Sequence, residues 1–296
     1  IPTVLTMTVV PLLGTLGAGS GYRTGFKWWA LIIAIVFVIS ETVCVLCVPE
    51  RPVKADGSSN GILDMFKALI HNDQAMTVVA SIILVYTSIN ICGNLILYFF
   101  KFDVGNEGAY SVFAAVVFAA QVLVMMIVPA LRRKFTKFEL FIFGFIIQIA
   151  GFAMMLLLAV SGIYTSDNWY VFCLPGCMVY IGYGILNVIM TIFLSDSVDY
   201  GELKNKTREE SVIFSMQTFT VKLASGLAIF LAGIIVDVIK LDKNALVQSQ
   251  STLNGLRMWM TIPSVILLII GIIIFKKFYK LNEQKMNEIK AKLKLK

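Results

Sequence analysis

The 296-residue chain is 58% hydrophobic and only 15% charged, and its mean hydropathy is +0.84. Because soluble domains carry about 25% charged residues, this composition excludes a water-soluble fold and predicts a chain that lies in a lipid bilayer. The net charge of +7 then indicates cytoplasmic loops and contact with anionic membrane lipid, and it gives no reason to expect nucleic acid as a partner.

Eight apolar segments are long enough to cross a bilayer as helices, since a hydrocarbon core requires about 20 residues. In chain order they are residues 1–18, 25–48, 75–100, 111–131, 138–160, 169–194, 212–239 and 256–275. The runs are continuous and lack the alternation of barrel strands, so the expected fold is an all-α, polytopic membrane protein. The chain begins inside an apolar segment without an initiator Met or a signal-peptide pattern, so we expect a fragment whose first residue lies in mid-protein.

One segment is typical of a linker between two blocks of helices. Residues 49–61 contain two Pro, two Gly and two Ser, which favour turns and loops. We therefore predict four parts: residues 1–48 are the last two helices of an N-terminal bundle, 49–73 a central loop, 74–279 a six-helix bundle and 280–296 a basic tail. Within the loop, residues 62–70 mix apolar and charged side chains, as a short interfacial helix would.

The basic residues predict the orientation of the helices. Of the 25 Lys and Arg residues, 18 fall in the central loop, in the connections at residues 132–137 and 204–208, and from Lys276 to the C-terminus. All of these lie on one side of the predicted bilayer. Cytoplasmic loops carry the excess of Lys and Arg, so the chain is expected to be a multi-pass protein of the cell membrane with a cytoplasmic C-terminus.

A dense group of charges lies between the segments that end at residue 194 and begin at residue 212. It reads Asp-x-x-Asp-Tyr-Gly-Glu from Asp196 to Glu202, and Arg208, Glu210 and Ser211 follow. We expect a cytoplasmic loop whose charge pairs seal one conformation of a transporter and part in the other. The residues predicted to form this gate or hinge are Asp196, Asp199, Tyr200, Glu202, Arg208 and Glu210. The alternative is a solvated loop whose ion pairs contribute about 0 to 1 kcal/mol each.

Lys222 is the charge that a membrane helix has most difficulty accommodating. It lies about ten residues into the segment from Val212, or roughly 15 Å, near the bilayer midplane, where an ammonium requires a partner or a water-filled cavity. Gln217, Thr218, Val221 and Ser225 share its helix face. Amide, hydroxyl and ammonium groups bind polyhydroxylated ligands, so this face is predicted to line a small-molecule cavity. The alternative is a structural ion pair between Lys222 and another helix.

These motifs together carry a family resemblance. Asp-x-x-Asp-Tyr-Gly-Glu, then Arg208, Glu210 and Ser211, then Ser215-x-Gln217-Thr218-x-x-Val221-Lys222 resemble the melibiose permease group, which is the glycoside-pentoside-hexuronide:cation symporter family of the major facilitator superfamily. The resemblance covers the whole chain. It implies a fold of twelve helices, of which about eight are present from the fifth onward, and symport of a sugar with Na⁺ or H⁺ by alternating access.

The resemblance also implies roles for individual residues. Positions that match Lys222, Gln217, Thr218 and Val221 lie at the family's sugar site. Asn187 stands where the family often has an aromatic residue that stacks on sugar, so this chain departs from the usual pyranose contact. The family's cation ligands lie in N-terminal helices upstream of Ile1, so no cation ligand is assigned in this chain.

The remaining features are weaker. Tyr86, Asn90 and Asn94 form a polar stripe on one helix, which lines the cavity or pairs helices. The five Cys and one His show no metal-binding pattern, and no nucleophile or phosphate-binding motif occurs, so we predict no enzyme, no metal and no cofactor beyond the coupling ion. Two other functions stay open: a facilitator that exports or exchanges another solute, and a truncated remnant that does not transport.

Overall fold

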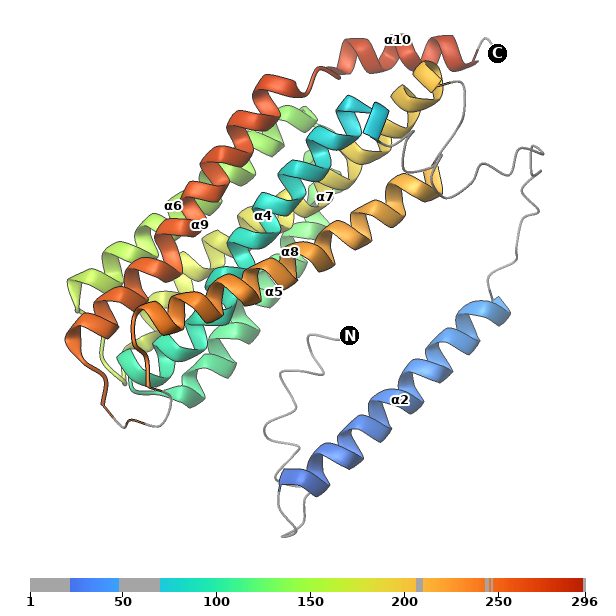
Figure 1. The fold of residues 1–296 in the computed structure, drawn as a ribbon. Coiled ribbons are helices and arrows are strands. Elements are labelled where there is room, and N and C mark those ends of the chain that lie inside the picture. The colour runs from blue at the N-terminus through green and yellow to red at the C-terminus, as the bar shows by residue number, and fades with distance from the viewer. Residues whose placement is uncertain (1–21, 48–69, 206–209, 243–244, 246, 295–296) are drawn as a thin grey trace. The chain divides into compact units, whose positions relative to one another are not determined.

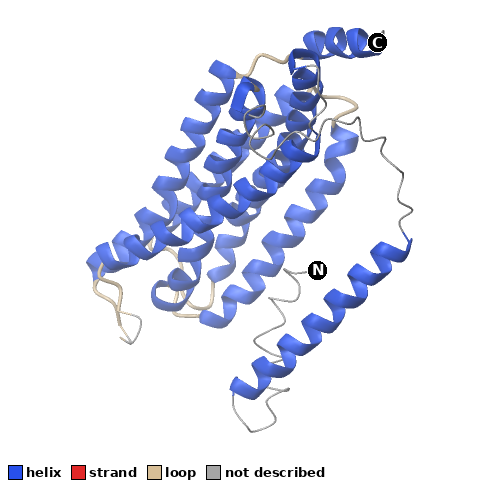
Figure 2. Cartoon of the chain, turned by 45° about the vertical axis from the view of Figure 1, so that its right-hand side comes forward, coloured by secondary structure: helices blue, strands red, loops and turns tan. Residues whose placement is uncertain are grey.

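The structure is a computed structural model that describes residues 22–47, 70–205, 210–242, 245 and 247–294. These residues form helices joined by turns, and no strand occurs among them (Figure 2). The chain divides into two units, residues 1–59 and 60–296. The predicted segment 1–18, most of the linker with its interfacial helix, and Arg208 lie outside the described residues.

The described part of the first unit is a single helix, α2 (Tyr22–Cys47). Within residues 24–47 an 18-residue window has a mean hydropathy of 2.7, which suits a membrane-spanning helix. Its side chains are almost all exposed. This helix corresponds to the predicted segment 25–48.

The described residues of the second unit form six long helices and a short terminal one (Figure 1). They are α4 (Asp73–Tyr98), α5 (Glu107–Leu131), α6 (Lys137–Ser161), α7 (Cys173–Asn205), α8 (Glu210–Val238), α9 (Gln250–Phe278) and α10 (Glu283–Lys294). The π-helical turn η1 (Phe99–Asp103) extends α4, and the 3₁₀ turn η2 (Trp169–Phe172) precedes α7. Counting α2, seven described helices are long and apolar enough to span a membrane, which confirms the predicted all-α, polytopic class.

Local capping explains where several helices begin. The side chains of Asn72, Asn106 and Ser249 each accept a hydrogen bond from a backbone N–H in the first turn of α4, α5 and α9. Thr136 and Glu139 form a reciprocal capping box at α6. Each of these side chains satisfies backbone donors that a helix leaves unpaired at its N-terminus.

Helix α7 packs against both α5 and α6, and α4 packs against α8 and α9. The contact between α6 and α7 is backbone to backbone. A Cβ atom at Gly182 would lie 2.6 Å from the carbonyl oxygen of Gly144, and one at Gly151 would lie 2.7 Å from the backbone nitrogen of Val179. Small residues allow this close approach, which is typical of membrane helix pairs.

The prediction of a short charged loop from Asp196 to Ser211 is wrong for the described residues of this segment. Residues 196–202 form the last turns of α7, which ends at Asn205, and α8 begins at Glu210. The segment contains no Pro, and Ser197, Val198 and Gly201 are buried, so packing continues the helix after its apolar run ends. The predicted basic tail likewise contains a helix, α10, which packs against α7.

Candidate functional site

A polar network joins three helices midway along α4. The Asn187 side chain on α7 donates from Nδ2 to the Tyr86 hydroxyl on α4 at 2.6 Å. One turn along α7, the Thr191 hydroxyl donates to the carbonyl oxygen of Asn187 at 3.0 Å. Gln217 on α8 donates from Nε2 to the Thr191 hydroxyl at 3.0 Å. The fold thus brings together three predicted residues, Tyr86, Asn187 and Gln217, that lie far apart in the sequence.

Two tyrosine rings pack against one another beside this network. The rings of Tyr86 and Tyr183 lie 5.3 Å apart at an interplanar angle of 78°, a favourable edge-to-face arrangement. Tyr183 lies one turn before Asn187 on α7. An aromatic side chain is therefore present beside position 187, although position 187 itself carries an amide.

The predicted polar face of α8 is only partly engaged. Thr218 and Lys222 are exposed, and Gln217, Val221 and Ser225 are half-buried. Thr218 and Ser225 direct their hydroxyls to backbone carbonyls of their own helix. Among the described residues, no ion pair or hydrogen bond of Lys222 is found, so the structural ion pair considered for it does not occur there.

Asn90 and Asn94 do not join the network. Each donates from Nδ2 to the carbonyl oxygen four residues earlier on α4, at 2.7 Å in both cases. Their amides are thereby held along their own helix, and Asn94 is exposed. Within the part of the chain that the structure describes, they line the face of α4 and pair no helices through their side chains.

Asp196 lies in a buried ionic cluster at the end of the unit that carries α10, which we name the α10 end. Its carboxylate accepts a short hydrogen bond from Nζ of Lys137, the first residue of α6. A second ammonium, of Lys290 on α10, lies 4.0 Å from the other carboxylate oxygen. Glu283 on α10 in turn pairs with Arg132 at 3.3 Å. These contacts tie α6, α7 and α10 together.

Aromatic rings enclose this cluster. Nζ of Lys137 lies 5.4 Å from the ring centroid of Phe193 and 5.8 Å from that of Phe138, within cation–π range. Tyr279 packs against Phe193 and Phe138. Burial, together with the negative charge of Asp196, raises the pKa of Tyr279, so its hydroxyl stays neutral at physiological pH.

The other predicted gate residues are spread over the adjoining helix ends. Tyr200 and Lys204 on α7 both bind Asp73 at the start of α4, with oxygen–oxygen and nitrogen–oxygen distances of 3.1 and 2.9 Å. Asp199 and Glu202 are half-buried on α7, and Glu210 is the exposed first residue of α8.

A second buried ion pair lies at the opposite end of the unit. Arg257 on α9 donates from Nε and Nη2 to the two carboxylate oxygens of Asp103, each at 2.7 Å. The Asp103 side chain is only 3% exposed, and the Tyr164 ring covers the guanidinium with its centroid 5.9 Å away. This bidentate pair joins the end of η1 to α9. Sequence reasoning missed it because each residue looks like an isolated interfacial charge.

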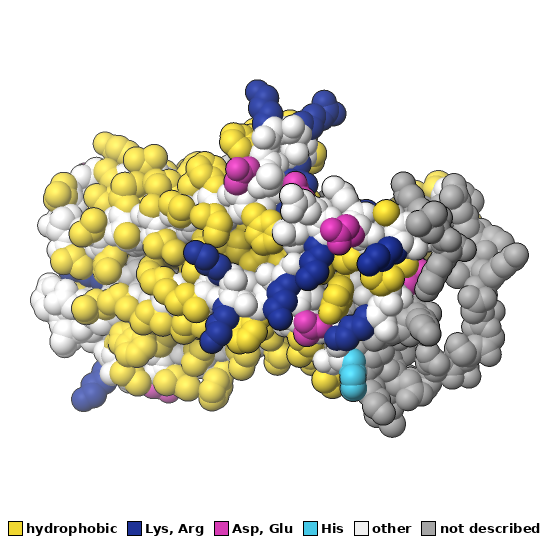
Figure 3. Space-filling view, turned by 90° about the horizontal axis from the view of Figure 1, so that it is seen from above, with side chains coloured by type: hydrophobic (Ala, Val, Ile, Leu, Met, Phe, Trp, Pro, Cys, Tyr) yellow, Lys and Arg dark blue, Asp and Glu magenta, His cyan; other side chains and the backbone are white. Residues whose placement is uncertain are grey.

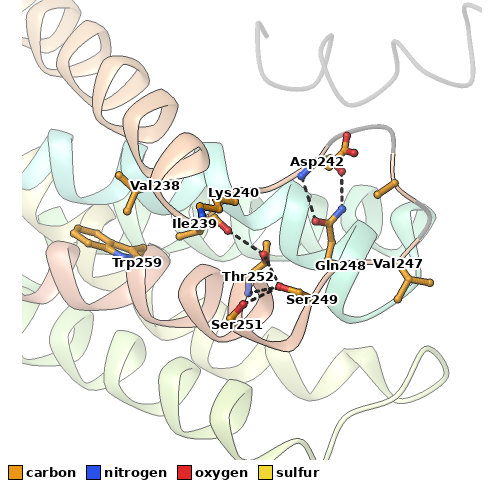
Figure 4. A pocket seen from close by; sticks show the side chains of 11 residues that line it. Val238, Ile239, Lys240, Asp242, Val247, Gln248, Ser249, Ser251, Thr252 and Trp259 are labelled. Carbon is orange, nitrogen blue, oxygen red and sulfur yellow. Dashed lines mark hydrogen bonds between the residues drawn. The ribbon is translucent and has the colours of Figure 1, made fainter.

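A pocket of about 570 Å³ lies at this opposite end, between the end of α8 and the start of α9 (Figure 4). Its polar residues bind one another. The Gln248 amide exchanges hydrogen bonds with the backbone of Asp242, and the Thr252 hydroxyl donates to the carbonyl of Ile239. None of the predicted sugar-binding residues lines it. These contacts close the turn between two helices.

A sequence model of the MFS/sugar transport protein family matches residues 2–283. The chain belongs to this family. The match extends over nearly the whole chain and includes the polar network and, from the ionic cluster, Lys137 and Asp196. It confirms the predicted resemblance and the prediction that the chain is no enzyme, and together with the apolar helices it identifies a multi-pass membrane protein.

Three of the relatives are named as a symporter, a carrier and an importer. The chain is 29% identical to the uncharacterized symporter YjmB of Bacillus subtilis, over 75% of this chain and 47% of that protein. It is 26% identical to the raffinose carrier protein of Pediococcus pentosaceus (98% and 45%) and 26% identical to a putative sulfoquinovose importer of Salmonella typhimurium (88% and 54%). The chain thus spans about half the length of these relatives.

Proposed function

We propose that the protein containing this chain is a secondary active transporter of the cell membrane that couples uptake of a sugar to Na⁺ or H⁺. The sugar is a glycoside, a pentoside or a hexuronide. The family match supports transport of a sugar, and two relatives are named for raffinose and sulfoquinovose. The C-terminus is cytoplasmic in this proposal, in line with the excess of Lys and Arg at the α10 end.

The observation that carries the proposal is that α8 carries both an ammonium without a counter-ion among the described residues and an amide that belongs to the three-helix polar network. Lys222 lies 12 residues after Glu210 on α8, or about 18 Å along the helix, and has no partner among the described residues. Gln217 stands on the same helix and is fixed by Thr191. An ammonium at this depth and an oriented amide are the groups with which a site holds a polyhydroxylated ligand.

Each sugar-site residue has a distinct role in this proposal. Lys222 donates to sugar oxygens, and Gln217 and Asn187 offer amide oxygens that have no partner among the described residues. Thr218 adds a hydroxyl, and Val221 provides an apolar contact. Asn187 additionally holds Tyr86, which lies against Tyr183. Asn90 and Asn94 line the approach along α4.

Transport follows alternating access, in which two helical bundles rock about a central site and only the state with sugar and cation bound reorients readily. Charged residues at the α10 end serve as the cytoplasmic gate or hinge: Asp196, Asp199, Tyr200, Glu202, Arg208 and Glu210. Asp196 acts through Lys137 and Lys290 in this scheme. The cation ligands are assigned to no described residue.

Uptake into membrane vesicles that contain the full-length protein tests the proposal. Labelled α- and β-galactosides, a xyloside and a glucuronide are offered under an imposed Na⁺ or H⁺ gradient. One of these should accumulate, and Lys222→Ala should abolish its accumulation, whereas Lys277→Ala, which removes an exposed lysine from the end of α9, should not. Near-normal uptake by Lys222→Ala would contradict the site assignment, and accumulation without either gradient would contradict symport.

A further inference from the structure

A groove of about 370 Å³ lies at the turn between α5 and α6. Its walls are Leu131, Phe135, Leu140 and Phe143, with Glu139 as the one polar lining residue. The groove forms because α5 and α6 each pack against α7 rather than against one another. The two helices diverge from their connecting turn and leave an apolar furrow between them.

The groove opens on the flank of the bundle, where a membrane-spanning unit meets lipid. Phe135 and Phe143 are 47% and 49% exposed, and the neighbouring Ile142 and Ile146 are exposed as well. Hydrocarbon side chains in this position face acyl chains without cost, whereas in water they would be unfavourable. The occupant that matches these walls is a hydrocarbon chain.

The turn beside the groove carries positive charge. Arg132, Arg133 and Lys134 form the turn that follows α5, and Arg132 is already paired with Glu283. Arg133 and Lys134 are exposed, and neither has an ion pair among the described residues. Glu139 is turned toward the helix cap, because its Oε2 accepts hydrogen bonds from the backbone N–H and the hydroxyl of Thr136 at 2.8 and 3.0 Å.

Seen from the α10 end, Lys and Arg side chains are spread over the end face while hydrophobic side chains fill much of the flank (Figure 3). Arg133 and Lys134 lie in the chain between Leu131 and Phe135, two of the residues that line the apolar groove. A ligand that satisfies both features has an anionic head and a hydrocarbon tail.

We propose that this groove binds one anionic phospholipid. An acyl chain lies against Phe135, Leu140 and Phe143, and the phosphate headgroup is held by Arg133 and Lys134. The site is separate from the polar network and does not depend on which solute the protein transports.

Native mass spectrometry of the intact, detergent-purified protein tests the proposal. Phosphatidylglycerol and phosphatidylcholine with identical acyl chains are titrated, and the dissociation constant of the first bound lipid is measured. Phosphatidylglycerol should bind more tightly. The double variant Arg133→Gln/Lys134→Gln should weaken its binding about 25-fold, since each basic residue near a headgroup contributes about a fivefold factor.

The control removes the same charge elsewhere at the same end. Lys285→Gln/Lys292→Gln, on the exposed side of α10, should change the dissociation constant less than twofold. An equal loss in this control would show diffuse attraction to the whole end face and would overturn the proposal, as would equal binding of the two lipids.

Two further outcomes would also overturn it. If soluble glycerol phosphate displaces phosphatidylglycerol at equal concentration, the headgroup charges bind phosphate alone and the groove has no role. If the spectra show a dimer, and Phe143→Ser dissociates it into monomers, a second copy of the chain occupies the groove. Retention of phosphatidylglycerol against glycerol phosphate, with loss on Phe143→Ser, supports the proposed lipid site.

Discussion

Each end of the second unit holds a buried carboxylate paired with a cation, but the two pairs are built differently. At the end away from α10, the guanidinium of Arg257 donates hydrogen bonds to both carboxylate oxygens of Asp103, each at 2.7 Å. At the α10 end, Asp196 faces two separate ammonium groups, a buried one from Lys137 and, at 4.0 Å, the half-exposed one of Lys290.

The difference is between a fixed clamp and an exchangeable contact. A guanidinium fork fits a carboxylate in one plane, which fixes the two elements that it joins. An ammonium is a point charge on a flexible stem, so one carboxylate can exchange one lysine for another at small geometric cost. The α10 end is therefore the better suited of the two to the proposed role of a gate.

The largest effect is expected from Asp103→Ala at the opposite end. It leaves the Arg257 guanidinium largely buried without a partner, which should lower the free energy of unfolding by about 3 to 5 kcal/mol. Thermal unfolding of the purified protein measures this. Glu107→Ala is the matched control, because it breaks the exposed 3.7 Å pair with Lys101 and should cost about 0 to 1 kcal/mol. If both variants lost a similar free energy of unfolding, the claim that the Asp103–Arg257 pair fixes this end would be contradicted.

Asp196→Ala should be somewhat less damaging. The Lys137 ammonium loses its carboxylate but retains the faces of Phe138 and Phe193, so we expect a loss of about 3 kcal/mol, at the lower end of the range for a broken buried pair. The same unfolding assay compares the two carboxylates directly. A loss larger than that of Asp103→Ala would reverse the proposed order of the two ends.

Replacing both partners separates stability from gating. Lys137→Met/Asp196→Leu removes the two charges and keeps their bulk, so its stability should return to within about 1 kcal/mol of the parent. Its transport rate should nevertheless differ if the pair is a gate, while sugar affinity stays constant. Uptake kinetics and sugar binding give the two readouts, and an unchanged rate would remove Asp196 from the gate.

The smallest effect is expected where Lys204 meets Asp73. Their side chains are 43% and 52% exposed, so Lys204→Ala should cost about 0 to 1 kcal/mol, and raising the salt concentration should remove even this difference. Unfolding measured at low and high salt checks the expectation. A loss that persists at high salt would mean that this contact behaves like the buried pairs.

Most helices could be predicted because hydropathy is a local property. The expected segments 111–131 and 138–160 correspond to α5 and α6, whose observed starts are set by the caps Asn106 and Thr136. The extension of α7 through Asp196 could not be predicted in the same way. Charges there resemble a loop, and only the packing of Ser197, Val198 and Gly201 against neighbouring elements keeps the segment helical.

The candidate site, like the fold, could be predicted only where the signal lies within one helix. The spacing of Lys222 and Gln217 predicted that they share one helix face, but the contacts of Thr191 with Gln217 and of Tyr183 with Tyr86 were not predicted, because single hydroxyl groups on an apolar helix carry no sequence signal. Lys137 was counted only as a loop charge. Its burial beside Asp196 becomes visible when α6 and α7 are packed together.

The sequence by itself determined the membrane class, the order of the helices and the motifs that match the family, since each depends on residues close together in the chain. Only the tertiary structure decided the partners. Asn187 meets Tyr86 across 101 positions of sequence, Lys137 meets Asp196 across 59, and Arg257 meets Asp103 across 154. The physical reason is that hydrophobicity and helix period act within one segment, whereas the pairing of polar groups depends on how separate helices pack and which of their faces become buried.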